Sequence, residues 1–553
     1  MNTPLPASPQ PSMPVSLWEP LRQALFRSIW TAALISNLGT WMQNVAGVWL
    51  VTTLSTSATL VALMQTATSL PVFLLSIPAG ALADMVDRRK LLLVTQTFMA
   101  LIALLLGIVT LTGLITAPLV VAFTFVLGIG SALNGPAWQT VTPEVVPRRL
   151  LPAAVTLNSV SVNLARAAGP ALGGLIIAYY SPGYLFLLNG LSFLITLRAL
   201  WQWTREPVTR TVPEDFFSAL RAGLRYVRYS PSLYVILIRA FAFTFGASAM
   251  WALLSLVIAR QLHQAAGTYG LMLSCIGAGA VTGALIQGKV SQWLSPNRRI
   301  IVAGLVFCLV NVCLAKLTSL VLLSGVMFLA GLAWLLVLTS FNASVQLQLP
   351  KWVQARALSV YMLVFQGGMA LGSLVWGTLG EAFGLPTSLV VAAGWLLVSM
   401  LLGIPFPIRS TEELDLTPAA NWSDPDVHMP VDYDDGPVVV MIEYDIEAAN
   451  RPAFYAAIQP LQRLRLRDGA SQIGIFTDVA IPERQVEFFT VPSWGEHLRQ
   501  HARFTQSDQA LERRVRAYHT GPDSPRVTHF VATQMDAMPT REVVNFENLV
   551  DHP

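Results

Sequence analysis

The segment Gly80-Ala-Leu-Ala-Asp-Met-Val-Asp-Arg-Arg-Lys90 follows directly on a long apolar run over residues 59–79. A helix of that length is long enough to cross the hydrocarbon core of a bilayer. The charged cluster at its end must then lie in a water-facing loop, and the three basic residues Arg88, Arg89 and Lys90 place this loop in the cytoplasm. The segment therefore predicts a protein that spans a membrane.

The composition of the whole chain supports the same prediction. Of its 553 residues, 54% are hydrophobic and only 12% are charged, and the mean hydropathy is +0.56. These values exclude a soluble globular protein of this size. The three cysteines, Cys275, Cys308 and Cys313, lie in apolar segments without paired spacing, so neither a disulfide framework nor a cysteine metal site is expected.

Apolar segments of about 20 residues, the length that a membrane span needs, occur about twelve times. Basic residues gather in the loops on one side of these spans, and the other side holds few besides Arg260 and Lys316. Positive charge marks the cytoplasmic side, so both termini are predicted to be cytoplasmic, in a multi-pass protein of a bacterial inner membrane. The approximate span centres are Asn37, Leu70, Leu101, Phe125, Gly169, Leu194, Thr244, Gly279, Phe307, Leu329, Gly367 and Leu397.

Two landmarks recur in the second half of the chain. The segment that begins at Gly288 is a degenerate copy of the one at Gly80, offset by 288 − 80 = 208 positions. The segment that begins at Pro143 aligns with the one at Pro350, offset by 350 − 143 = 207 positions. Nearly equal offsets indicate two duplicated six-helix bundles, joined by a basic amphipathic stretch.

At these residues the chain resembles the major facilitator superfamily. The Gly80 segment is similar to the loop signature Gly-x-Leu-Ala-Asp-x-x-Gly-Arg-Arg/Lys, with Asp87 in place of the second glycine. In the fifth span, Gly169-Pro170-Ala-Leu-Gly173-Gly174 is similar to the Gly-Pro-x-x-Gly-Gly signature of exporters in that superfamily. The closest resemblance covers nearly the whole chain and is to the transmembrane secretion effector branch, which contains the enterobactin-exporter-like proteins.

This resemblance implies an α-helical membrane protein with the twelve-helix fold, which exports small amphipathic molecules such as drugs or siderophore-like metabolites by alternating access and proton antiport. The expected partners are a small-molecule substrate and the lipid bilayer, with no nucleic acid and no cofactor. A Gly-x-x-x-x-Gly-Lys-Ser/Thr loop is absent from the sequence, so ATP is not the expected energy source. Two other functions stay open: a transporter fused to an oxygenase-like enzyme that modifies its cargo, and a metabolite importer or sensor.

The loop signature is a candidate conformational latch, formed by Gly80, Asp84, Arg88 and Arg89. Gly80 would let a neighbouring helix approach closely, and Asp84 would lie near the start of the third helix, where the helix dipole favours negative charge. The basic residues would hold the cytoplasmic ends of the halves together in one conformation. The alternative is that the cluster serves only to set the topology.

The exporter signature in the fifth span, Gly169, Pro170, Gly173 and Gly174, has a mechanical interpretation. Proline removes a backbone hydrogen bond and glycines allow tight packing, so this helix could bend or pack closely where the halves must rock. Ordinary packing of small residues between membrane helices is the alternative.

Arg166 lies about a dozen residues into its span, on the order of 20 Å from the cytoplasmic end. A charge at this depth is expected to face a cavity or a partner, and the sequence offers no acid at the same depth. One hypothesis is that an anionic group of the substrate is its counter-ion. The other is that backbone carbonyls, water and the side chains of Asn158 or Asn163 satisfy it structurally.

Other polar residues complete the set of candidate substrate or coupling positions. Gln43 and Asn44 in the first span could line a central cavity or form hydrogen bonds between helices. Because no acid lies in mid-membrane, proton coupling would have to use Glu144 or Asp84 near the cytoplasmic rim, or Glu381 on the far side.

After Arg409 the chain changes to ordinary polar sequence. Strands are predicted over 438–444, 471–479, 485–491 and 526–533, and helices over 450–466 and 493–516. This βαββαβ order is ferredoxin-like and resembles the dimeric α+β barrels of the antibiotic-biosynthesis monooxygenase type, which implies possible dimerisation through this domain. The predicted domains are residues 1–27, 28–203, 204–232, 233–408, 409–437 and 438–553.

His497 and His501 lie four residues apart, on one face of a predicted helix. Such a pair could bind a metal ion, yet Leu498 occupies the position where a zinc protease carries its glutamate. The sequence reveals no third ligand nearby, so we expect a surface or packed pair and no metal site. No nucleophile, base or cofactor loop is evident in this domain, so we name no catalytic residue and expect a transporter, with an oxygenase-like activity of the C-terminal domain as the open alternative.

Overall fold

The structure is a computed structural model that describes residues 16–203, 216–350, 352–408, 415, 417, 419 and 427–532. It separates into two compact units. Unit 1 holds the helical bundle. Unit 2 holds the C-terminal α+β domain together with two short segments, Leu224–Ser230 and Pro350–Val353.

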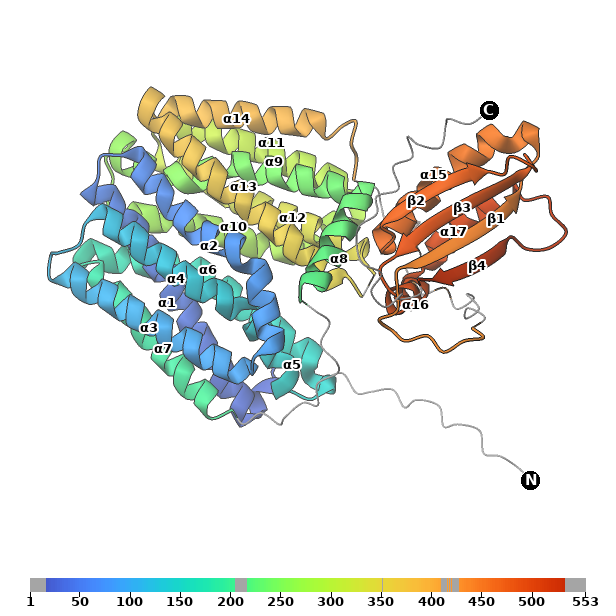
Figure 1. Ribbon diagram of the computed structural model, residues 1–553. Coiled ribbons are helices and arrows are strands. Elements are labelled where there is room, and N and C mark those ends of the chain that lie inside the picture. Colours follow the sequence, from blue (N-terminus) through green and yellow to red (C-terminus); the bar gives the residue numbers. More distant parts are fainter. Residues whose placement is uncertain are drawn as a thin grey trace, which may run out of the picture. The chain divides into compact units, whose positions relative to one another are not determined.

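Twelve long helices make up the described part of unit 1, and each of the twelve predicted span centres falls in one of them, in order (Figure 1). The first bundle contains α1 (Ala24–Leu54), α2 (Ala58–Met85), α3 (Arg88–Leu111), α4 (Ala117–Gln139), α6 (Leu151–Tyr179) and α7 (Gly183–Trp201). The second contains α9 (Pro231–Leu256), extended by the π-helical turn η3 (Val257–Gln261), then α10 (Ala266–Trp293), α11 (Pro296–Lys316), α12 (Leu320–Leu347), α13 (Gln354–Phe383) and α14 (Leu385–Leu402).

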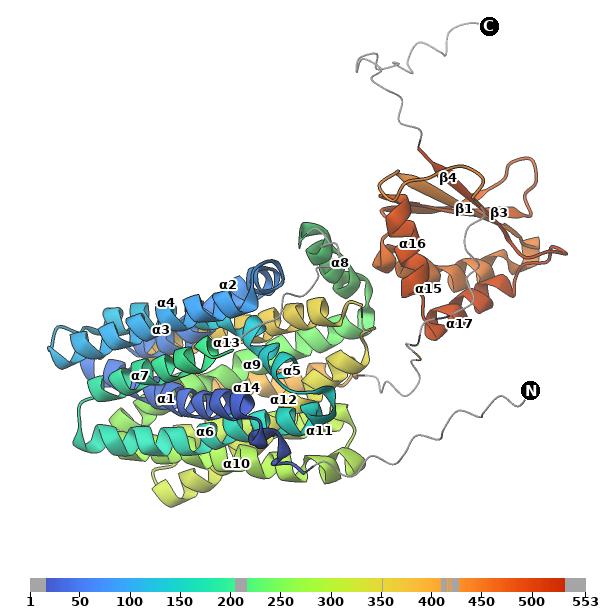
Figure 2. The ribbon, with the colours of Figure 1, turned by 90° about the horizontal axis from the view of Figure 1, so that it is seen from below.

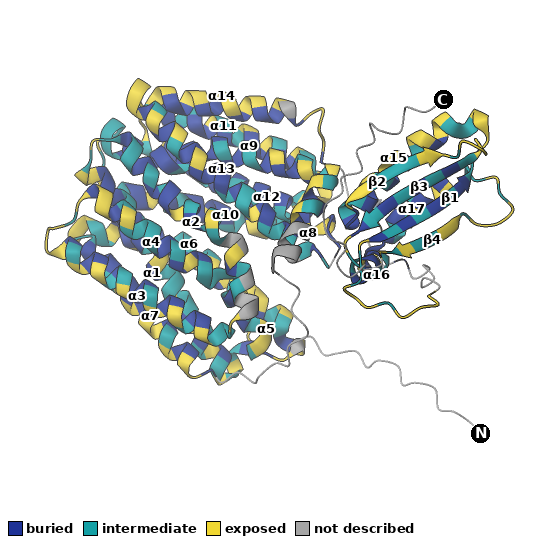
Figure 3. Cartoon of the chain, in the orientation of Figure 1, coloured by how far each residue is buried: buried dark blue, intermediate teal, exposed yellow. Residues whose placement is uncertain are grey.

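Ten of the described helices are long and apolar enough to cross a membrane, and α14 is a shorter apolar helix. The helices bury their inner faces against one another, and exposed residues gather on the outside of the bundle (Figure 3). On α3, exposed apolar residues recur on one face of the helix: Val94, Leu101, Leu105 and Ile108. An apolar outer surface suits contact with lipid tails.

The bundle has two ends, which we name by their charge. The basic end carries the turn between α2 and α3 and the short elements η1 (Glu19–Arg22), α5 (Val141–Val145) and η2 (Arg148–Leu150). The opposite end carries the turn between α1 and α2, residues 55–57. The two halves meet along two helix pairs, α2 with α13 and α6 with α10.

At the basic end, helix α2 extends through Met85, so Asp84 lies in the last turn of α2, four residues before α3 begins at Arg88. The residue that caps α3 is Asp87, whose side chain accepts a hydrogen bond from the backbone N–H of Lys90 at 2.9 Å. The acid that replaces the signature glycine therefore satisfies an otherwise unpaired helix N–H group. The side chain of Asp84 lies outside the described residues.

The C-terminal domain is a four-stranded antiparallel sheet with strand order β2-β3-β1-β4. Its elements are β1 (Val438–Asp445), the short turn η5 (Ala448–Asn450), α15 (Arg451–Asp468), β2 (Gln472–Thr477), β3 (Arg484–Val491), α16 (Trp494–Arg503), α17 (Gln506–Arg516) and β4 (Arg526–Val531). The helices cover one face of the sheet (Figure 2). The predicted βαββαβ order is confirmed, although the predicted strand over 526–533 ends at Val531 and its last residue lies outside the described part.

One predicted helix of this domain, residues 493–516, is in fact two. Helix α16 ends at Arg503, and Thr505 starts α17 with a capping box in which Thr505 and Asp508 each accept the other's backbone N–H. A capping box favours a new helix start over continuation of the previous helix. Helix α16 is thereby free to run in its own direction across the sheet.

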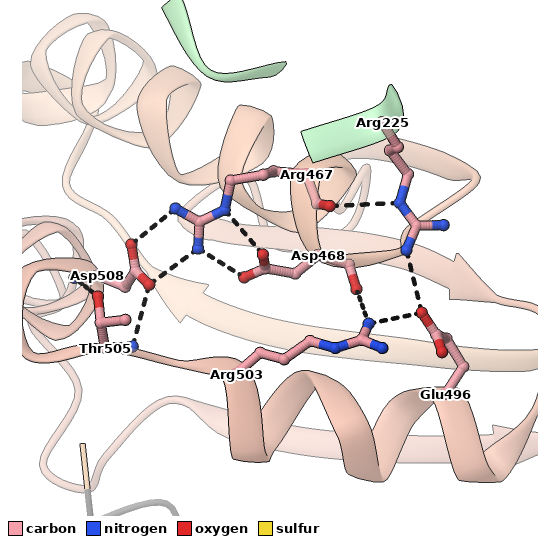
Figure 4. Close-up of polar contacts among 7 residues, drawn as sticks. All are labelled: Arg225, Arg467, Asp468, Glu496, Arg503, Thr505 and Asp508. Atoms are coloured by element: carbon pink, nitrogen blue, oxygen red, sulfur yellow. Dashed lines mark hydrogen bonds and ion pairs between the residues drawn. The ribbon is translucent and has the colours of Figure 1, made fainter. Parts of the chain in front are cut away.

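Unit 2 also includes part of the amphipathic helix α8 (Phe216–Tyr229) (Figure 4). Arg225 of α8 forms an ion pair with Glu496 at 3.0 Å and donates to the carbonyl oxygen of Arg467 at 3.3 Å. Glu496 also accepts from Arg503 at 2.8 Å, and the Arg503 guanidinium lies 4.4 Å from the ring centroid of Trp352. Two segments that adjoin membrane helices thus fold with the C-terminal domain.

Candidate functional site

A cavity of about 260 Å³ lies at the centre of unit 1, between the two halves. Helices α1, α2, α3, α4, α6 and α7 of the first half and α9, α10, α12 and α13 of the second contribute side chains to it. Its wall is mostly apolar and rich in aromatic rings, with a few polar groups. The aromatic residues in the wall are Trp41, Phe186, Trp251, Tyr269, Trp334 and Phe365, and the polar ones include Gln43, Asn44, Gln65, Arg166 and Gln366.

Arg166 is the only charged side chain among the described residues that line this cavity. It comes from the middle of α6, and its guanidinium lies 5.9 Å from the ring centroid of Trp41 on α1, within range of a cation–π interaction. No described carboxylate forms an ion pair with it. The cavity therefore presents one positive charge, flanked by an aromatic ring, at a depth where charge is costly unless it meets a partner.

The two asparagines that could have satisfied Arg166 are engaged elsewhere. The Asn158 side chain donates to the hydroxyl oxygen of Thr142 at 2.7 Å, and the Asn163 side chain donates to the carbonyl oxygen of Ser159 in its own helix at 2.9 Å. Neither residue lines the cavity. Their proposed structural role toward Arg166 is therefore not supported by the hydrogen bonds that the structure describes.

Gln43 and Asn44 both line the cavity, as predicted. The Gln43 carbonyl oxygen accepts a hydrogen bond from the side chain of Asn189 on α7 at 2.7 Å, so its orientation is held from the first bundle. Gln366 of α13 supplies a second amide from the other half. A bound molecule would thus meet amide groups from both halves, of which Gln43 is held in place by Asn189.

The exporter signature packs α6 between two other helices. A Cβ placed on Gly169 would lie 2.6 Å from the Trp41 Cβ, and one on Gly173 would lie 3.2 Å from the Met42 Cα, both on α1. Gly174 faces the other half, because a Cβ there would lie only 2.8 Å from the Gly270 Cα on α10. Close backbone contact of this kind needs glycine.

Pro170 belongs to the same contact. It lies inside the continuous helix α6, and a Cβ on Gly270 would lie 2.6 Å from its carbonyl oxygen. The four signature residues are thus brought together on one helix, with α1 on one side and the second half on the other.

The loop signature makes its described contacts within the first bundle. Arg88 forms an ion pair with Glu144 at 2.9 Å, and Arg89 donates to the carbonyl oxygens of Leu200 and Trp201 at the end of α7. Two predicted site residues, Arg88 and Glu144, therefore meet. The expected close helix approach at Gly80 was wrong, because a Cβ there would have no atom within 4 Å.

A contact between the halves that we did not predict lies at the opposite end of the bundle. Glu381, in the last turn of α13, accepts hydrogen bonds from the Ser57 hydroxyl at 2.7 Å and the Thr59 N–H at 2.9 Å. Arg260 donates to the carbonyl oxygens of Ser55 and Thr56, each at 2.8 Å. Charged residues are scarce at this end of the bundle, and this scarcity was the signal that could have identified Glu381 and Arg260 as contact residues.

In the C-terminal domain the structure supplies the third histidine that the sequence analysis did not find. His529 of β4 lies beside His497 and His501 of α16, and ring nitrogens of the three lie within 4.8 Å of one another. Burial, together with the neighbouring histidines, lowers the pKa of His497 to about 4 and that of His501 to about 3. Burial also lowers the pKa of His529. The sequence analysis expected no metal site because it found no third ligand near His497 and His501, and this premise was wrong.

Comparison with known proteins gives a consistent result. A family model described as transmembrane secretion effector matches residues 15–537. The chain is 26% identical over 386 residues to the enterobactin exporter EntS of Salmonella typhimurium, an alignment that covers 68% of this chain and 91% of that protein. It is 22% identical over 360 residues to the staphyloferrin A transporter of Staphylococcus aureus, with 64% and 89% covered.

This chain is about as similar to a drug transporter as it is to these two siderophore transporters. The multidrug efflux pump Tap of Mycolicibacterium fortuitum is 24% identical over 383 residues, with 68% of this chain and 92% of that protein covered. Among solved structures, a bacterial homologue of the human lysosomal transporter Spinster, in an inward-facing conformation, superposes with a TM-score of 0.54 at 14% identity. That match covers 69% of this chain and 96% of the other, and it supports the fold alone.

Proposed function

Because this chain belongs to the transmembrane secretion effector family, we propose that it exports a small amphipathic molecule that carries an anionic group, of the siderophore or drug type. The protein is a multi-pass secondary transporter of small molecules, and its relatives are named as siderophore and multidrug exporters. The family and these relatives are transporters, so the alternative of a fused cargo-modifying enzyme is not favoured. Arg166 is the observation that carries the anionic part of the proposal, because it is the only charge among the described residues of an otherwise apolar and amide-lined cavity.

The experiment that tests this function compares metabolites in the spent medium of cells with and without the protein. We expect an anionic amphipathic compound to disappear from the medium and accumulate in cells that lack the transporter. Purified protein in proteoliposomes should then transport that compound. If spent media are identical, or if the compound accumulates outside the deletion cells, the chain is not its exporter.

Alternating access gives the contacts between the halves a mechanical role. The cavity is bounded toward the opposite end of the bundle by the Glu381 and Arg260 contacts to residues 55–59 and by the Gly174–Gly270 crossing. We infer that these contacts hold the transporter closed toward the outside, and that their separation releases the substrate. A substrate that binds more tightly to one of the two states, closed or open toward the outside, would shift the balance toward that state.

We propose that the basic end of the bundle and both termini are cytoplasmic, and that the membrane is a bacterial inner membrane. The lopsided distribution of arginine and lysine supports this orientation. A reporter fused after Arg409 is expected to behave as cytoplasmic, and one inserted in the loop Thr112–Pro118 as external. An external signal from the first fusion would reverse the orientation.

Proton coupling is a prediction from the family resemblance, and the described carboxylates restrict how it could work. None of the described residues that line the cavity is an acid, whereas Glu144 and Glu381 lie at the two ends of the bundle. Coupling would then act through the contacts that open and close the halves, with Glu144 beside Arg88 as one candidate. Export that continues at the normal rate after collapse of the proton gradient would exclude it.

We also propose that two copies associate through the face of the sheet that the described helices leave uncovered. Phe476 is 58% exposed and Phe530 is 51% exposed, and both lie on this face. An exposed apolar patch of this kind marks an interaction surface, and the resemblance to dimeric α+β barrels makes a second copy the occupant. The patch consists of Val439, Met441, Phe476, Val486, Phe488 and Phe530.

A charge placed in this patch should dissociate the pair. Phe530→Arg is expected to convert a dimer to a monomer, as measured by light scattering of the detergent-solubilised protein, because an arginine would be buried without a partner. Val479→Arg is the matched control, since Val479 is 97% exposed in the turn between β2 and β3. A monomeric wild-type protein, or a dimer that survives Phe530→Arg, would contradict this interface.

A further inference from the structure

Three histidines from two elements meet in the C-terminal domain. His497 and His501 are four residues apart on α16 and therefore project from the same face of the helix. His529 lies on β4 directly opposite Val440 of β1, and Val440 is buried. Residues directly opposite one another on antiparallel strands share a face of the sheet, so His529 lies on the face that the helices cover.

The distances within this histidine cluster are close to those of a metal site. The Nε2 atoms of His497 and His501 are 3.2 Å apart. Two imidazole nitrogens bound at about 2.0–2.1 Å to one tetrahedral ion would be separated by roughly 3.3 Å. Ligand nitrogens of all three histidines lie within 4.8 Å of one another, so a displacement on the order of 1 Å would complete a three-nitrogen site.

Neighbouring side chains orient the ligand that lies deepest. His497 is fully buried, and its Nδ1 lies 3.4 Å from the side-chain oxygen of Gln500. When Nδ1–H donates to this oxygen, the lone pair of Nε2 points toward His501, the arrangement that metal-bound histidines use. The ring of Trp494 packs against both His497 and His529 and limits their rotation.

The positive charge of Arg465 acts on His497 and His501. Two carboxylates offset this charge, because the Arg465 guanidinium lies 3.7 Å from Glu487 and 3.8 Å from Glu512. One guanidinium between two carboxylates leaves the buried surroundings of the cluster with no excess of positive charge.

We propose that His497, His501 and His529 bind one divalent transition-metal ion through their imidazole nitrogens, with a fourth coordination position open. Three neutral nitrogen donors suit Zn²⁺ and its neighbours Co²⁺, Ni²⁺ and Cu²⁺, and do not suit Mg²⁺ or Ca²⁺, which prefer oxygen. For both Nε2 atoms to bind the ion, the single proton of neutral His501 moves from Nε2 to Nδ1, so each Nε2 offers a lone pair and no proton is released. The third ligand, His529, is not evident from the sequence around the histidine pair because it lies on strand β4 and the pair lies on helix α16.

The test uses full-length protein without a histidine tag, stripped with a chelator and then titrated with Zn²⁺ by calorimetry. We expect one ion bound per chain, no heat with Mg²⁺, and a visible absorption band typical of tetrahedral coordination when Co²⁺ is added. His529→Gln and His501→Gln should each weaken Zn²⁺ binding by more than about 10-fold, and Gln500→Leu by about 10-fold through loss of the orienting contact.

His428→Gln, a change at a histidine outside the cluster, is the matched control and should bind like the wild type. Because the Co²⁺ spectrum is recorded on the wild type, a variant that fails to fold does not remove the test. If the wild-type protein binds no stoichiometric Zn²⁺, or if both His501→Gln and His529→Gln bind it unchanged, the three histidines form only a packed cluster and the proposal is overturned.

Discussion

Replacement of Gly174 by valine is expected to lower export by about 10-fold or more, because the added side chain would meet the backbone of α10. A Cβ at this position would lie 2.8 Å from the Gly270 Cα and 3.0 Å from the Ala266 carbonyl oxygen. Backbone cannot rotate away as a flexible side chain can, so the two halves would have to separate. Overpacking of about 1–3 kcal/mol would shift the balance between the two states by roughly 5-fold to 140-fold, with each 1.4 kcal/mol worth about tenfold.

The measurement is the rate of substrate loss from loaded cells, at equal abundance of each variant in the membrane. Gly325→Val is the matched control, because Gly325 lies on the exposed face of α12 and a Cβ there would have no atom within 4 Å. Gly270→Val, on the other side of the same crossing, should reproduce the loss. Normal export by both Gly174→Val and Gly270→Val would mean that the transport cycle does not require this contact between the halves.

Replacement of Arg166 by glutamine is expected to weaken export of anionic substrates by about 30-fold and to leave neutral or cationic dyes nearly unaffected. The loss of one partner from a buried charge pair costs about 2 kcal/mol or more, which corresponds to that factor. The exchange retains hydrogen-bonding capacity and approximate length but removes the positive charge. Arg166→Lys, which keeps the charge but loses the planar group that can stack on Trp41, should retain partial export.

The control for this prediction is Arg198→Gln. Arg198 is an exposed arginine in the last turn of α7 and does not line the cavity. Concentration dependence should show the Arg166→Gln effect mainly as a higher half-saturating concentration, since the residue acts on binding. A uniform loss for all substrates, accompanied by low abundance of the variant, would instead assign Arg166 a structural role.

Much of the architecture was predictable from the sequence. Membrane spans are encoded locally, because about 20 consecutive apolar residues are needed to cross a bilayer and little else has that pattern. The strands of the C-terminal domain are encoded just as locally, for example by the β-branched and apolar run Val438-Val-Val-Met-Ile442 in β1. One local feature was missed: Thr505 and Asp508 form a capping box that divides the helix predicted over residues 493–516.

The candidate site was only partly predictable. Arg166 and Gln43 could be selected because a polar side chain within an apolar span is costly and must face something polar. Their surroundings could not be derived, since Asn158 and Asn163 turned out to bond elsewhere and Trp41 is the neighbour of Arg166. Spacing along the chain does not reveal which helix lies beside which.

The amino-acid order alone was sufficient to establish a membrane protein with two six-helix halves and a ferredoxin-like domain, because hydropathy and periodicity act over a few turns of chain. The contacts that give these parts a mechanism depend on packing. Glu381 meets Ser57, Gly174 meets Gly270, and His529 meets the histidine pair on α16. Each contact joins residues that are remote in sequence or belong to different elements. A side-chain contact of this kind is determined by how helices and strands pack in three dimensions. The hydropathy and periodicity of the sequence do not specify that packing.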